Sequence, residues 1–312
     1  MGETKTDSAF YALIDWGTSS FRLWLVDENG SVLAQSRSDE GMMYASENGF
    51  LETLERHLAL SGASFDLPVV ISGMAGARQG WKEAPYIALP SALSGMAAQS
   101  VKVEHGARDI RILPGMAQKK PESPNVMRGE ETQLAGIANS MPTGLVCMPG
   151  THCKWVELKD NAVTELTSFM TGEIFSVLSK NSILKHAMEA NAEFDAQNPV
   201  FLRAMRQALE EPGQVFSMFF SIRAGQLLGF EQVDEGAAHL SGLLIGAEIA
   251  AAKQIYGTGK AGLVASDRLN ALYLPVMQEA GFTVTLFDGE DAVRTGLLTA
   301  AKQIKAHAGN IK

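Results

Sequence analysis

One pattern occurs twice in this sequence, and it limits the folds that the chain can adopt. Residues 10–27 are predicted to form a strand, a tight turn and a second strand, and residues 145–158 repeat that order. Each copy places a glycine and a threonine in the turn, Gly17-Thr18 in the first and Gly150-Thr151 in the second. Because each copy is followed by helices and further strands, the chain is predicted to be an α/β protein built from two similar halves.

The rest of the chain alternates between strand and helix patterns. Short apolar or β-branched runs predict strands at 31–35, 68–72, 110–114, 263–265 and 283–287. Apolar residues at helical spacing predict helices at 49–60, 129–138, 173–190, 197–210, 214–230, 236–256, 267–280 and 291–307.

A polar break at 139–144 indicates where one half ends. We therefore expect an N-terminal domain at 8–140 and a C-terminal domain at 141–312, with the last helix able to pack back on the N-terminal domain. Within the helix at 236–256, Gly242 and Gly246 are expected to permit close packing against a neighbour.

Composition excludes several classes of protein. The 312 residues carry a formal charge of −9, whereas a protein that binds nucleic-acid phosphates needs a basic face. Cys147 and Cys153 are too few for a disulfide framework or a four-cysteine zinc site. The apolar run at 243–252 is too short for a membrane span, and residues 1–8 lack the apolar core of a secretory signal. We expect a cytoplasmic protein with neither nucleic-acid nor membrane partners, and the oligomeric state stays open, a homo-oligomer included.

The two glycine turns suit phosphate binding. A strand that ends in such a turn leaves backbone N–H groups without ladder partners, and those groups form a nest for an anion. Glycine matters because a side chain would hold the phosphate away from the backbone. Asp15 lies beside the first turn, where a carboxylate can hold the waters of Mg²⁺. Taken singly, each turn is better explained as an ordinary hairpin, with Asp15 capping the first. Together they predict a phosphate site formed by Gly17, Thr18, Ser19, Gly150 and Thr151.

Longer motifs accompany the turns, at 14–19, 80–86, 125–134, 148–156, 169–173 and 240–248. In this order they cover nearly the whole chain, and it resembles the superfamily of sugar kinases, heat-shock ATPases and actin. In detail it resembles the 2-dehydro-3-deoxygalactonokinases. The resemblance implies two ribonuclease-H-like domains with a nucleotide cleft between them, the actin/hexokinase-like fold. It also implies that ATP phosphorylates the C6 hydroxyl of 2-dehydro-3-deoxy-D-galactonate in D-galactonate catabolism, with ATP and Mg²⁺ as cofactors.

One segment departs from the pattern of that family. The family usually has glycine in the nucleotide-side loop after the strand at 263–265, and here Ala265 and Ser266 occupy it. We still expect both residues to contact the nucleotide. Lys154, directly after the second turn, is expected to reach a phosphate, and its alternative role is that of an exposed strand lysine.

Phosphoryl transfer needs a base for the attacking hydroxyl. Glu130 and Glu131 open the helix at 129–138, and sugar kinases and exopolyphosphatases of the superfamily carry their catalytic carboxylate in a similar segment. Successive side chains on a helix diverge by about 100°, so one of the two is expected to point into the cleft. Glu130 is favoured because it follows the glycine directly. Their alternative role is to complement the helix dipole.

A sugar acid also needs a cationic partner, and arginine binds carboxylates in a bidentate manner. Arg78 in a glycine-rich loop is the first candidate, with Trp81 as a wall of the site, and Arg128 is the second. Glu173 is expected to accept a hydrogen bond from a sugar hydroxyl. The sequence does not distinguish galactonate from gluconate derivatives.

Two alternatives share this fold. An exopolyphosphatase-like phosphohydrolase would use water in place of the sugar, and a non-enzymatic actin-like module would bind nucleotide and change shape. Sustained phosphate release without an acceptor would indicate the first, and slow turnover that sugar acids do not change would indicate the second.

Overall fold

The computed structural model describes residues 9–104, 108–189 and 193–309, and the expectation drawn from residues 1–8 lies outside this range. The chain forms two compact units. Unit 1 comprises 1–143, 157–166 and 289–312, and unit 2 comprises 144–156 and 167–288. Each unit is described separately below.

Unit 1 contains most of the first half of the chain and the last helix. Its strands are β1 (Tyr11–Trp16), β2 (Phe21–Val26), β3 (Val32–Ser38), β4 (Val69–Gly73), β5 (Tyr86–Ala88), β6 (Ser91–Ala92), β7 (Val101–Val103), β8 (Ile110–Ile112), β9 (Gly115–Gln118) and β10 (Asn125–Met127). Its helices are α1 (Met42–Asn48), α2 (Phe50–Leu60), α3 (Glu130–Ile137) and α9 (Gly289–Gly309), with 3-10 turns η1 (Met74–Gly76), η2 (Leu93–Gly95) and η3 (Ala97–Gln99).

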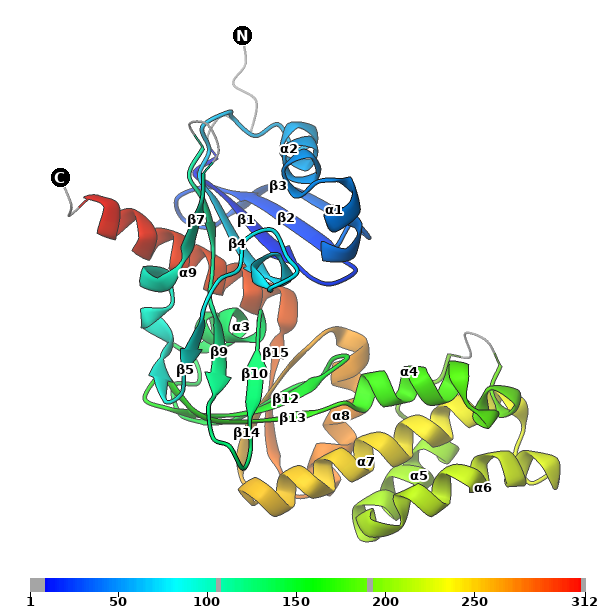
Figure 1. Ribbon diagram of the computed structural model, residues 1–312. Helices are drawn as coiled ribbons and strands as arrows, with labels where there is room; N and C mark the ends of the chain where they lie inside the picture. Colours follow the sequence, from blue (N-terminus) through cyan, green and yellow to red (C-terminus); the bar gives the residue numbers. More distant parts are fainter. Residues whose placement is uncertain (1–8, 105–107, 190–192, 310–312) are drawn as a thin grey trace. The chain divides into compact units, whose positions relative to one another are not determined.

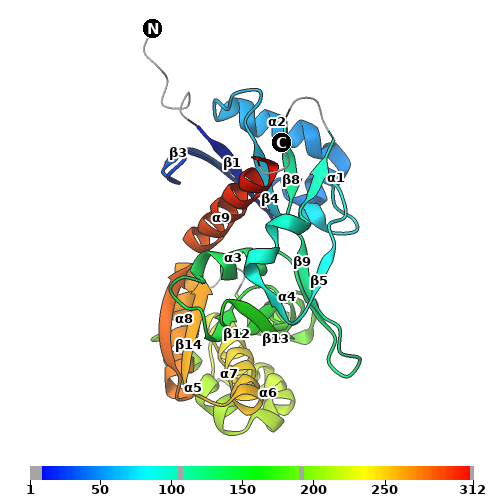
Figure 2. The ribbon, with the colours of Figure 1, turned by 90° about the vertical axis from the view of Figure 1, so that its left-hand side faces the viewer.

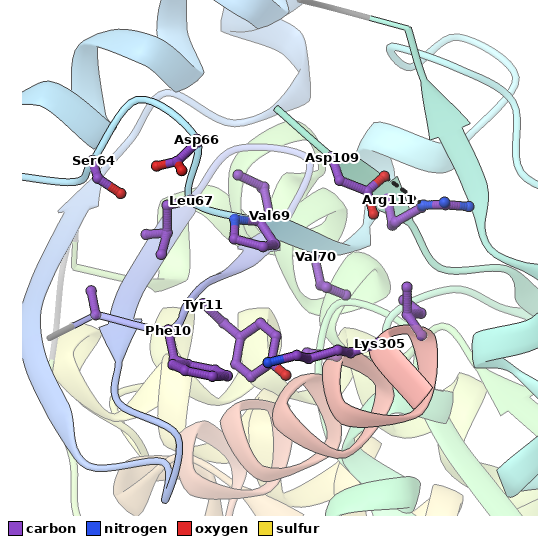
Figure 3. Close-up of a pocket in the computed structure, with 14 residues that line it drawn as sticks. Phe10, Tyr11, Ser64, Asp66, Leu67, Val69, Val70, Asp109, Arg111 and Lys305 are labelled. Carbon is purple, nitrogen blue, oxygen red and sulfur yellow. Dashed lines mark hydrogen bonds and ion pairs between the residues drawn. The ribbon is translucent and has the colours of Figure 1, made fainter. Parts of the chain in front are cut away.

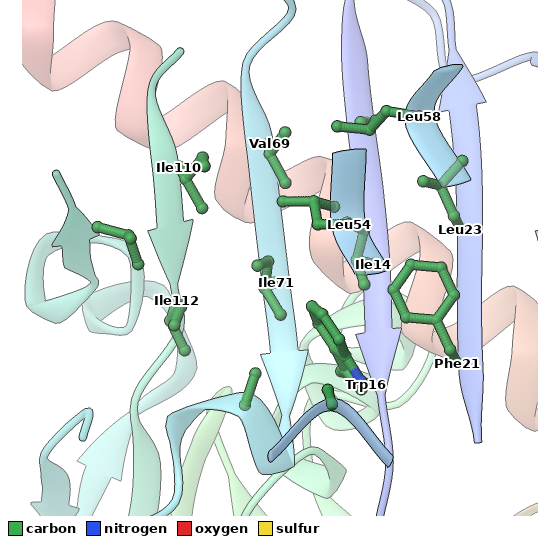
Figure 4. Close-up of a cluster of buried hydrophobic side chains, with 14 of the residues drawn as sticks. Ile14, Trp16, Phe21, Leu23, Leu54, Leu58, Val69, Ile71, Ile110 and Ile112 are labelled. Carbon is green, nitrogen blue, oxygen red and sulfur yellow. The ribbon is translucent and has the colours of Figure 1, made fainter. Parts of the chain in front are cut away.

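The main sheet of unit 1 has the strand order β3-β2-β1-β4-β8-β7. The pairs β1–β2 and β2–β3 are antiparallel, whereas the pairs β1–β4 and β4–β8 are parallel. Side chains alternate between two buried faces, as strand geometry requires. Ile14 and Trp16 pack with α2 on one face, whose buried cluster is shown in Figure 4. Tyr11 and Leu13 pack on the other face.

Helix α9 covers that second face of the sheet, as Figures 1 and 2 show. It also contacts α3 through two glycines. A Cβ atom built on Gly136 would lie 1.9 Å from the carbonyl oxygen of Ala292, and one on Gly296 would lie 1.9 Å from that of Thr132. Any side chain at either position would push α3 and α9 apart.

Unit 2 contains the second copy of the strand–turn–strand pattern. Its strands are β11 (Gly144–Met148), β14 (Lys260–Ala265), β15 (Thr283–Asp288), and the parts of β12 (Cys153–Lys159) and β13 (Ala162–Phe169) that lie outside 157–166. Its helices are α4 (Thr171–Asn181), α5 (Pro199–Glu210), α6 (Val215–Leu227), α7 (Gly236–Tyr256) and α8 (Asp267–Glu279), with 3-10 turns η4 (Ile183–Ala187), η5 (Pro212–Gln214) and η6 (Val233–Glu235).

The strand order β13-β12-β11-β14-β15 in the second sheet matches β3-β2-β1-β4-β8 in the first. Strands β11, β14 and β15 are parallel, as β1, β4 and β8 are. The repeated order confirms the predicted α/β class and the ribonuclease-H-like topology of each half.

Glycines in α7 allow α5 to approach it closely, as the sequence predicted. A Cβ atom on Gly242 would lie 2.6 Å from the carbonyl oxygen of Phe201, and one on Gly246 would lie 2.6 Å from that of Met205. Helix α7 is buried along most of its length. Within the described residues, every helix is too short or too polar to cross a bilayer.

Most predicted elements are confirmed, and the misses are short or irregular. The sequence prediction omitted α1, which begins after Gly41, and the strand β13. It also omitted β5, β6, β7, β9 and β10, none of which exceeds four residues. The helix predicted at 173–190 is in fact two pieces, because α4 ends at Asn181 and a 3-10 turn follows.

Candidate functional site

The first Gly-Thr turn connects β1 to β2, and the start of α1 supports it. The N–H groups of Met42 and Met43 donate to the carbonyl oxygens of Gly17 and Thr18, at 2.9 and 3.1 Å. Gly41 allows this approach, because a Cβ atom there would lie 2.5 Å from the backbone of the turn. The carbonyl oxygens of the turn are therefore held by a helix, while Thr18 and Ser19 stay exposed.

Asp15 lies directly before this turn, on β1. Its carboxylate forms an ion pair with Arg22 of β2, with 2.7 Å between Oδ2 and Nη2. Burial raises the pKa of Asp15 above its usual range, the nearby Glu290 carboxylate adds to the rise, and Arg22 opposes both. The side chain keeps 15% of its surface exposed, so a ligand can reach it.

The carboxyl ends of β1 and β4 meet the start of α3. Asp15 pairs with Ser72 in the parallel register, and the Ser72 hydroxyl lies 2.7 Å from that of Thr132 in α3. Gly73 and Gly129 both have positive φ, at 94° and 109°, and a Cβ atom on Gly129 would lie 3.6 Å from the Cα of Gly73. The glycines thus let the acidic start of α3 approach the strand ends.

Both acids of α3 fold back on the backbone before the helix. Glu130 accepts the N–H of Arg128 at 3.0 Å, and both carboxylate oxygens of Glu131 accept the N–H of Gly129, at 2.8 and 2.9 Å. Glu131 is buried, whereas Glu130 is half-exposed. Burial, helped by the Glu130 charge, raises the pKa of Glu131 to about 7. The two neighbouring acids therefore differ in how much of each side chain solvent can reach.

The second Gly-Thr turn connects β11 to β12, and the start of α4 supports it. The N–H of Glu173 donates to the carbonyl oxygen of Thr151 at 3.0 Å. Gly172 is required here, because a Cβ atom on it would lie 2.4 Å from the carbonyl oxygen of Gly150. At Gly150 itself a Cβ atom would meet nothing closer than the carbonyl oxygen of His152 at 3.9 Å, so the protein leaves room there.

Lys154 and Glu173 flank this second turn. Lys154 is buried, in contrast to the exposed strand lysine considered above, and its ammonium group donates to the hydroxyl of Ser168 at 3.0 Å. Glu173 forms a short hydrogen bond with Nε2 of His152, so its carboxylate already has a partner on the turn.

A cavity of about 390 Å³ opens in unit 2 next to the second turn. Two of the residues predicted to contact the nucleotide, Gly150 and Ser266, line it, whereas Ala265 is buried at the end of β14. Ser266 has φ −72° and ψ 160°, an ordinary extended conformation, so its backbone does not need the glycine that is usual in the family. The remaining walls carry four polar side chains, those of Thr171, Ser241, Arg268 and Tyr273. The others are Gly172, Phe175, Phe194, Leu244, Ile245, Leu269 and Leu272.

A buried carboxylate joins the walls of this cavity. Glu248 of α7 accepts hydrogen bonds from Trp155 Nε1 at 2.8 Å, from Tyr273 Oη at 2.8 Å and, at short range, from the hydroxyl of Thr171. Burial raises the pKa of Glu248, and the three donors oppose the rise. Glu248 therefore connects β12, α4 and α8 around the cavity.

The candidates for the sugar acid differ in their surroundings. Arg78 is exposed in the loop after η1. Trp81 is half-buried, stacks on Phe50 with 6.0 Å between ring centroids, and touches Trp16. The guanidinium of Arg128 lies over the Tyr86 ring, and Nη2 donates to the carbonyl oxygen of Ala84. Nε and Nη1 of Arg128 are buried without a hydrogen-bond partner within the described structure.

A separate cavity of about 360 Å³ lies in unit 1 at the amino ends of β1 and β4. Figure 3 shows it with Lys305 of α9 over the Phe10 ring and with the Asp109–Arg111 ion pair. Ligands of open α/β sheets bind at the carboxyl ends of the strands, where Asp15 lies. This cavity contains none of the predicted site residues.

Comparisons with known proteins decide the family. The family model described as 2-keto-3-deoxy-galactonokinase matches residues 15–300. The chain belongs to this family. The resemblance inferred from the motifs is therefore confirmed.

Two curated relatives and two solved structures illustrate the match. A protein of Rhizobium meliloti (strain 1021) named a probable 2-dehydro-3-deoxygalactonokinase, DgoK1, is 47% identical, with 96% of this chain and 99% of that protein covered. The 2-dehydro-3-deoxygalactonokinase of Escherichia coli (strain K12) is 32% identical, with 95% and 99% covered.

Among structures, one from Sinorhizobium meliloti carries the same kinase designation on a provisional basis, at 47% identity and a TM-score of 0.90, with 95% of this chain and 97% of that chain covered. The activator of 2-hydroxyisocaproyl-CoA dehydratase from Clostridium difficile shares the fold at 13% identity and a TM-score of 0.50, with 97% and 98% covered.

Sequence reasoning missed several residues that line the cavity of unit 2. Phe175, Phe194, Ser241 and Leu272 are far apart in the chain and meet only in the folded cavity. Glu248 looked like a mere interruption of the apolar run at 243–252. A single acid inside a helix that is otherwise apolar was the available signal, because such a group is buried only when donors satisfy it.

Proposed function

We propose that the protein is an ATP-dependent kinase that phosphorylates the C6 hydroxyl of 2-dehydro-3-deoxy-D-galactonate in the catabolism of D-galactonate. The observation that carries the proposal is the family match over residues 15–300, together with a cavity that the second Gly-Thr turn borders. In the reaction the C6 oxygen bonds to the γ-phosphorus of ATP, the bond from that phosphorus to the β–γ bridging oxygen breaks, and ADP leaves.

The cavity in unit 2 is the proposed nucleoside site. Its volume of about 390 Å³ and its apolar walls are typical of a small-molecule pocket, with Ser266 and Arg268 as polar contacts. Gly150 and Thr151 would bind phosphate oxygens through their backbone, and the open space at Gly150 supports this role. Lys154 would add positive charge. In unit 1, Gly17, Thr18 and Ser19 would bind phosphate in the same way.

Asp15 is the proposed magnesium ligand. Mg²⁺ in kinases keeps several waters and needs only one or two carboxylates, so a single, partly accessible acid beside a phosphate turn fits it. When bound, the ion neutralises charge on the phosphates. Arg22 holds the Asp15 carboxylate in place and limits its protonation.

Glu130 is the proposed base. A base must touch the hydroxyl it deprotonates, and Glu130 is half-exposed whereas Glu131 is buried with both oxygens on Gly129. Glu131 would then act as a positioning residue that holds the backbone before α3.

Arg128 and Arg78 are the proposed partners of the sugar-acid carboxylate. The buried Nε and Nη1 atoms of Arg128 lack acceptors, which supports Arg128 because a carboxylate oxygen would supply an acceptor to one of them. Exposure supports Arg78, with Trp81 as a neighbouring wall and Glu173 as an acceptor for a sugar hydroxyl.

The decisive experiment measures ADP formation with ATP and Mg²⁺ across a panel of 2-dehydro-3-deoxy sugar acids, galactonate and gluconate forms included. Strong dependence on the galactonate form is expected. Phosphate release without an acceptor, or slow turnover that no sugar acid changes, would overturn the proposal in favour of a phosphohydrolase or a nucleotide-binding module.

The same assay separates the two acids. Glu130→Gln should lower kcat by roughly 10²- to 10⁴-fold and leave the KM for ATP unchanged, because only proton transfer is lost. Arg128→Lys and Arg78→Lys should each be compared for a rise in the KM for the sugar acid alone. A normal kcat in Glu130→Gln together with a large loss in Glu131→Gln would reassign the base to Glu131.

A further inference from the structure

The α6 segment carries an apolar surface that the proposed kinase reaction does not use. Helix α6 (Val215–Leu227) packs on α7 through its buried residues Val215 and Ile222. Figure 1 shows it at the edge of the helical group α4–α7. Its other side is apolar but exposed, with Phe216 89%, Phe220 63%, Leu227 64%, Leu228 68% and Phe230 80% accessible.

These five residues, the α6 surface, form one continuous strip. At 100° per residue, Phe216, Phe220 and Leu227 fall within about 40° of one another, and about 100–160° away from the buried Val215 and Ile222. After the helix, the chain turns back, and the N–H of Phe230 donates to the carbonyl oxygen of Gly225 at 2.8 Å. That turn keeps Leu228 and Phe230 at the C-terminal end of the strip.

The α6 surface is large for a monomer. With about 200 Å² for a fully exposed large apolar side chain, the five residues expose roughly 700 Å². A typical monomer has a largest apolar patch of about 300–600 Å², and each partner in a stable dimer buries about 800 Å². The strip therefore supplies most of the area that one half of a dimer interface needs.

The strip contains one charged residue. At 100° per residue, Arg223 lies on the same side of the helix as Phe216, Phe220 and Leu227. Its guanidinium donates to the carbonyl oxygen of His186 and to the side chain of Gln226. Arginine is enriched at protein interfaces, so its presence is compatible with a buried contact. Ala224 lies on the same side as the phenylalanines and is half-buried, so its small side chain would let a second helix approach.

An anionic membrane is a poor alternative occupant. Helices that lie on such membranes carry lysine and arginine on their polar face, and the only cation of α6 already has partners. The flanking segments are acidic, with Glu210 and Glu211 before the helix and Glu231, Asp234 and Glu235 after it.

We propose that the α6 surface binds the same surface of a second copy of this chain, so that the protein is a two-fold symmetric dimer. Both copies present the same, mainly apolar strip, and each Arg223 keeps its hydrogen-bond partners within its own chain. The proposal is independent of the kinase reaction.

The first test measures molar mass in solution by light scattering between about 1 and 100 µM, a range that covers dimers of ordinary affinity. Twice the chain mass is expected. Phe216→Asp with Phe220→Asp should halve it and leave the thermal unfolding midpoint within a few degrees, because both side chains are exposed.

A matched control places two aspartates at exposed apolar positions elsewhere, Leu60→Asp with Ile255→Asp, which are 76% and 54% accessible. This variant should stay dimeric. A monomeric wild-type protein, a dimer that survives the α6 substitutions, or loss of the dimer in the control as well would overturn the proposal. Wild-type monomers that bind anionic vesicles would assign the surface to a membrane instead.

A second measurement does not depend on the folding of the aspartate variants. Both natural cysteines are buried, so Phe220→Cys or Leu227→Cys would introduce an accessible thiol on the strip itself. Near a two-fold axis such a thiol lies close to its own copy and should form a disulfide-linked dimer on mild oxidation. A dimer in which neither position cross-links would exclude α6 as its contact.

Discussion

The first Gly-Thr turn follows β1 in unit 1, the second follows β11 in unit 2, and in both a helix start donates N–H groups to the carbonyl oxygens of the turn. Both leave threonine and the next residue exposed. They differ in the charges nearby. Asp15 precedes the first turn, and the buried Lys154 follows the second. The two copies thus share a backbone arrangement and differ in the charge beside it, and the proposed roles follow that difference, a metal ion at the first turn and phosphate at the second.

Removing the acid at the first turn should have the largest effect. Asp15→Asn keeps the shape of the side chain but removes the charge that would hold Mg²⁺, and kcat should fall by about 10²- to 10³-fold. The measurement is kcat as a function of Mg²⁺ concentration. Arg22→Met, which breaks the same ion pair from the other side, should cost clearly less. Equal losses in the two variants would show that the ion pair has only a structural role.

The acid pair beside the first turn should also make stability depend on pH. The pKa of Glu131 is raised from 4.5 to about 7 in the folded protein. Its proton therefore adds stability that is complete below pH 4.5 and is lost as the pH rises through about 7. The linked change is at most about 3 kcal/mol.

Urea unfolding at pH 5 and pH 8 measures this change. The wild-type protein should lose more stability between the two values than Glu131→Gln does. Glu130→Gln should show an intermediate loss, because burial is the larger cause of the raised pKa and the neighbouring charge is the smaller one. Parallel losses in all three proteins would refute the raised pKa.

The two helix starts that support the turns should be equally intolerant of a side chain. Gly41→Ala and Gly172→Ala would place Cβ atoms 2.5 and 2.4 Å from turn backbone. Each should lower the free energy of unfolding by about 2 kcal/mol. Gly213→Ala, whose Cβ atom would meet nothing within 4 Å, is the matched control. A loss of stability in only one of the two variants would show that the two turns are not supported in the same way.

The smallest expected effect tests the second turn directly. Gly150→Ala adds a methyl group that meets no protein atom closer than 3.9 Å, so the thermal midpoint should not change. If phosphate oxygens approach the backbone there, the KM for ATP should rise about tenfold, which corresponds to about 1.4 kcal/mol. An unchanged KM would argue against phosphate at this turn.

The sequence was informative where local rules decide the structure. The duplicated turns, the strands that flank them and the close packing of α7 through Gly242 and Gly246 all follow from glycine chemistry and periodicity. Helix α1 escaped prediction because Gly41 begins it with no side-chain cap, and β13 because its residues are mostly half-buried and show weak alternation.

The sites were predicted less completely than the fold. Gly150 and Ser266 were assigned to the nucleotide and do line one cavity, but the apolar walls come from helices far apart in the chain. Burial separates Glu130 from Glu131, and no spacing rule could have shown which carboxylate would be buried. The roles of Arg78, Trp81, Arg128 and Glu173 stay predictions.

Helix α9 has a consequence for how the chain reaches its native state. The sheet of unit 1 is encoded near the start of the gene, yet one of its faces is covered by residues 289–309. During synthesis on the ribosome, that apolar face stays exposed to solvent, or is covered by a chaperone, until the residues of unit 2 and then α9 have been made. The second half of the molecule can therefore mature before the first.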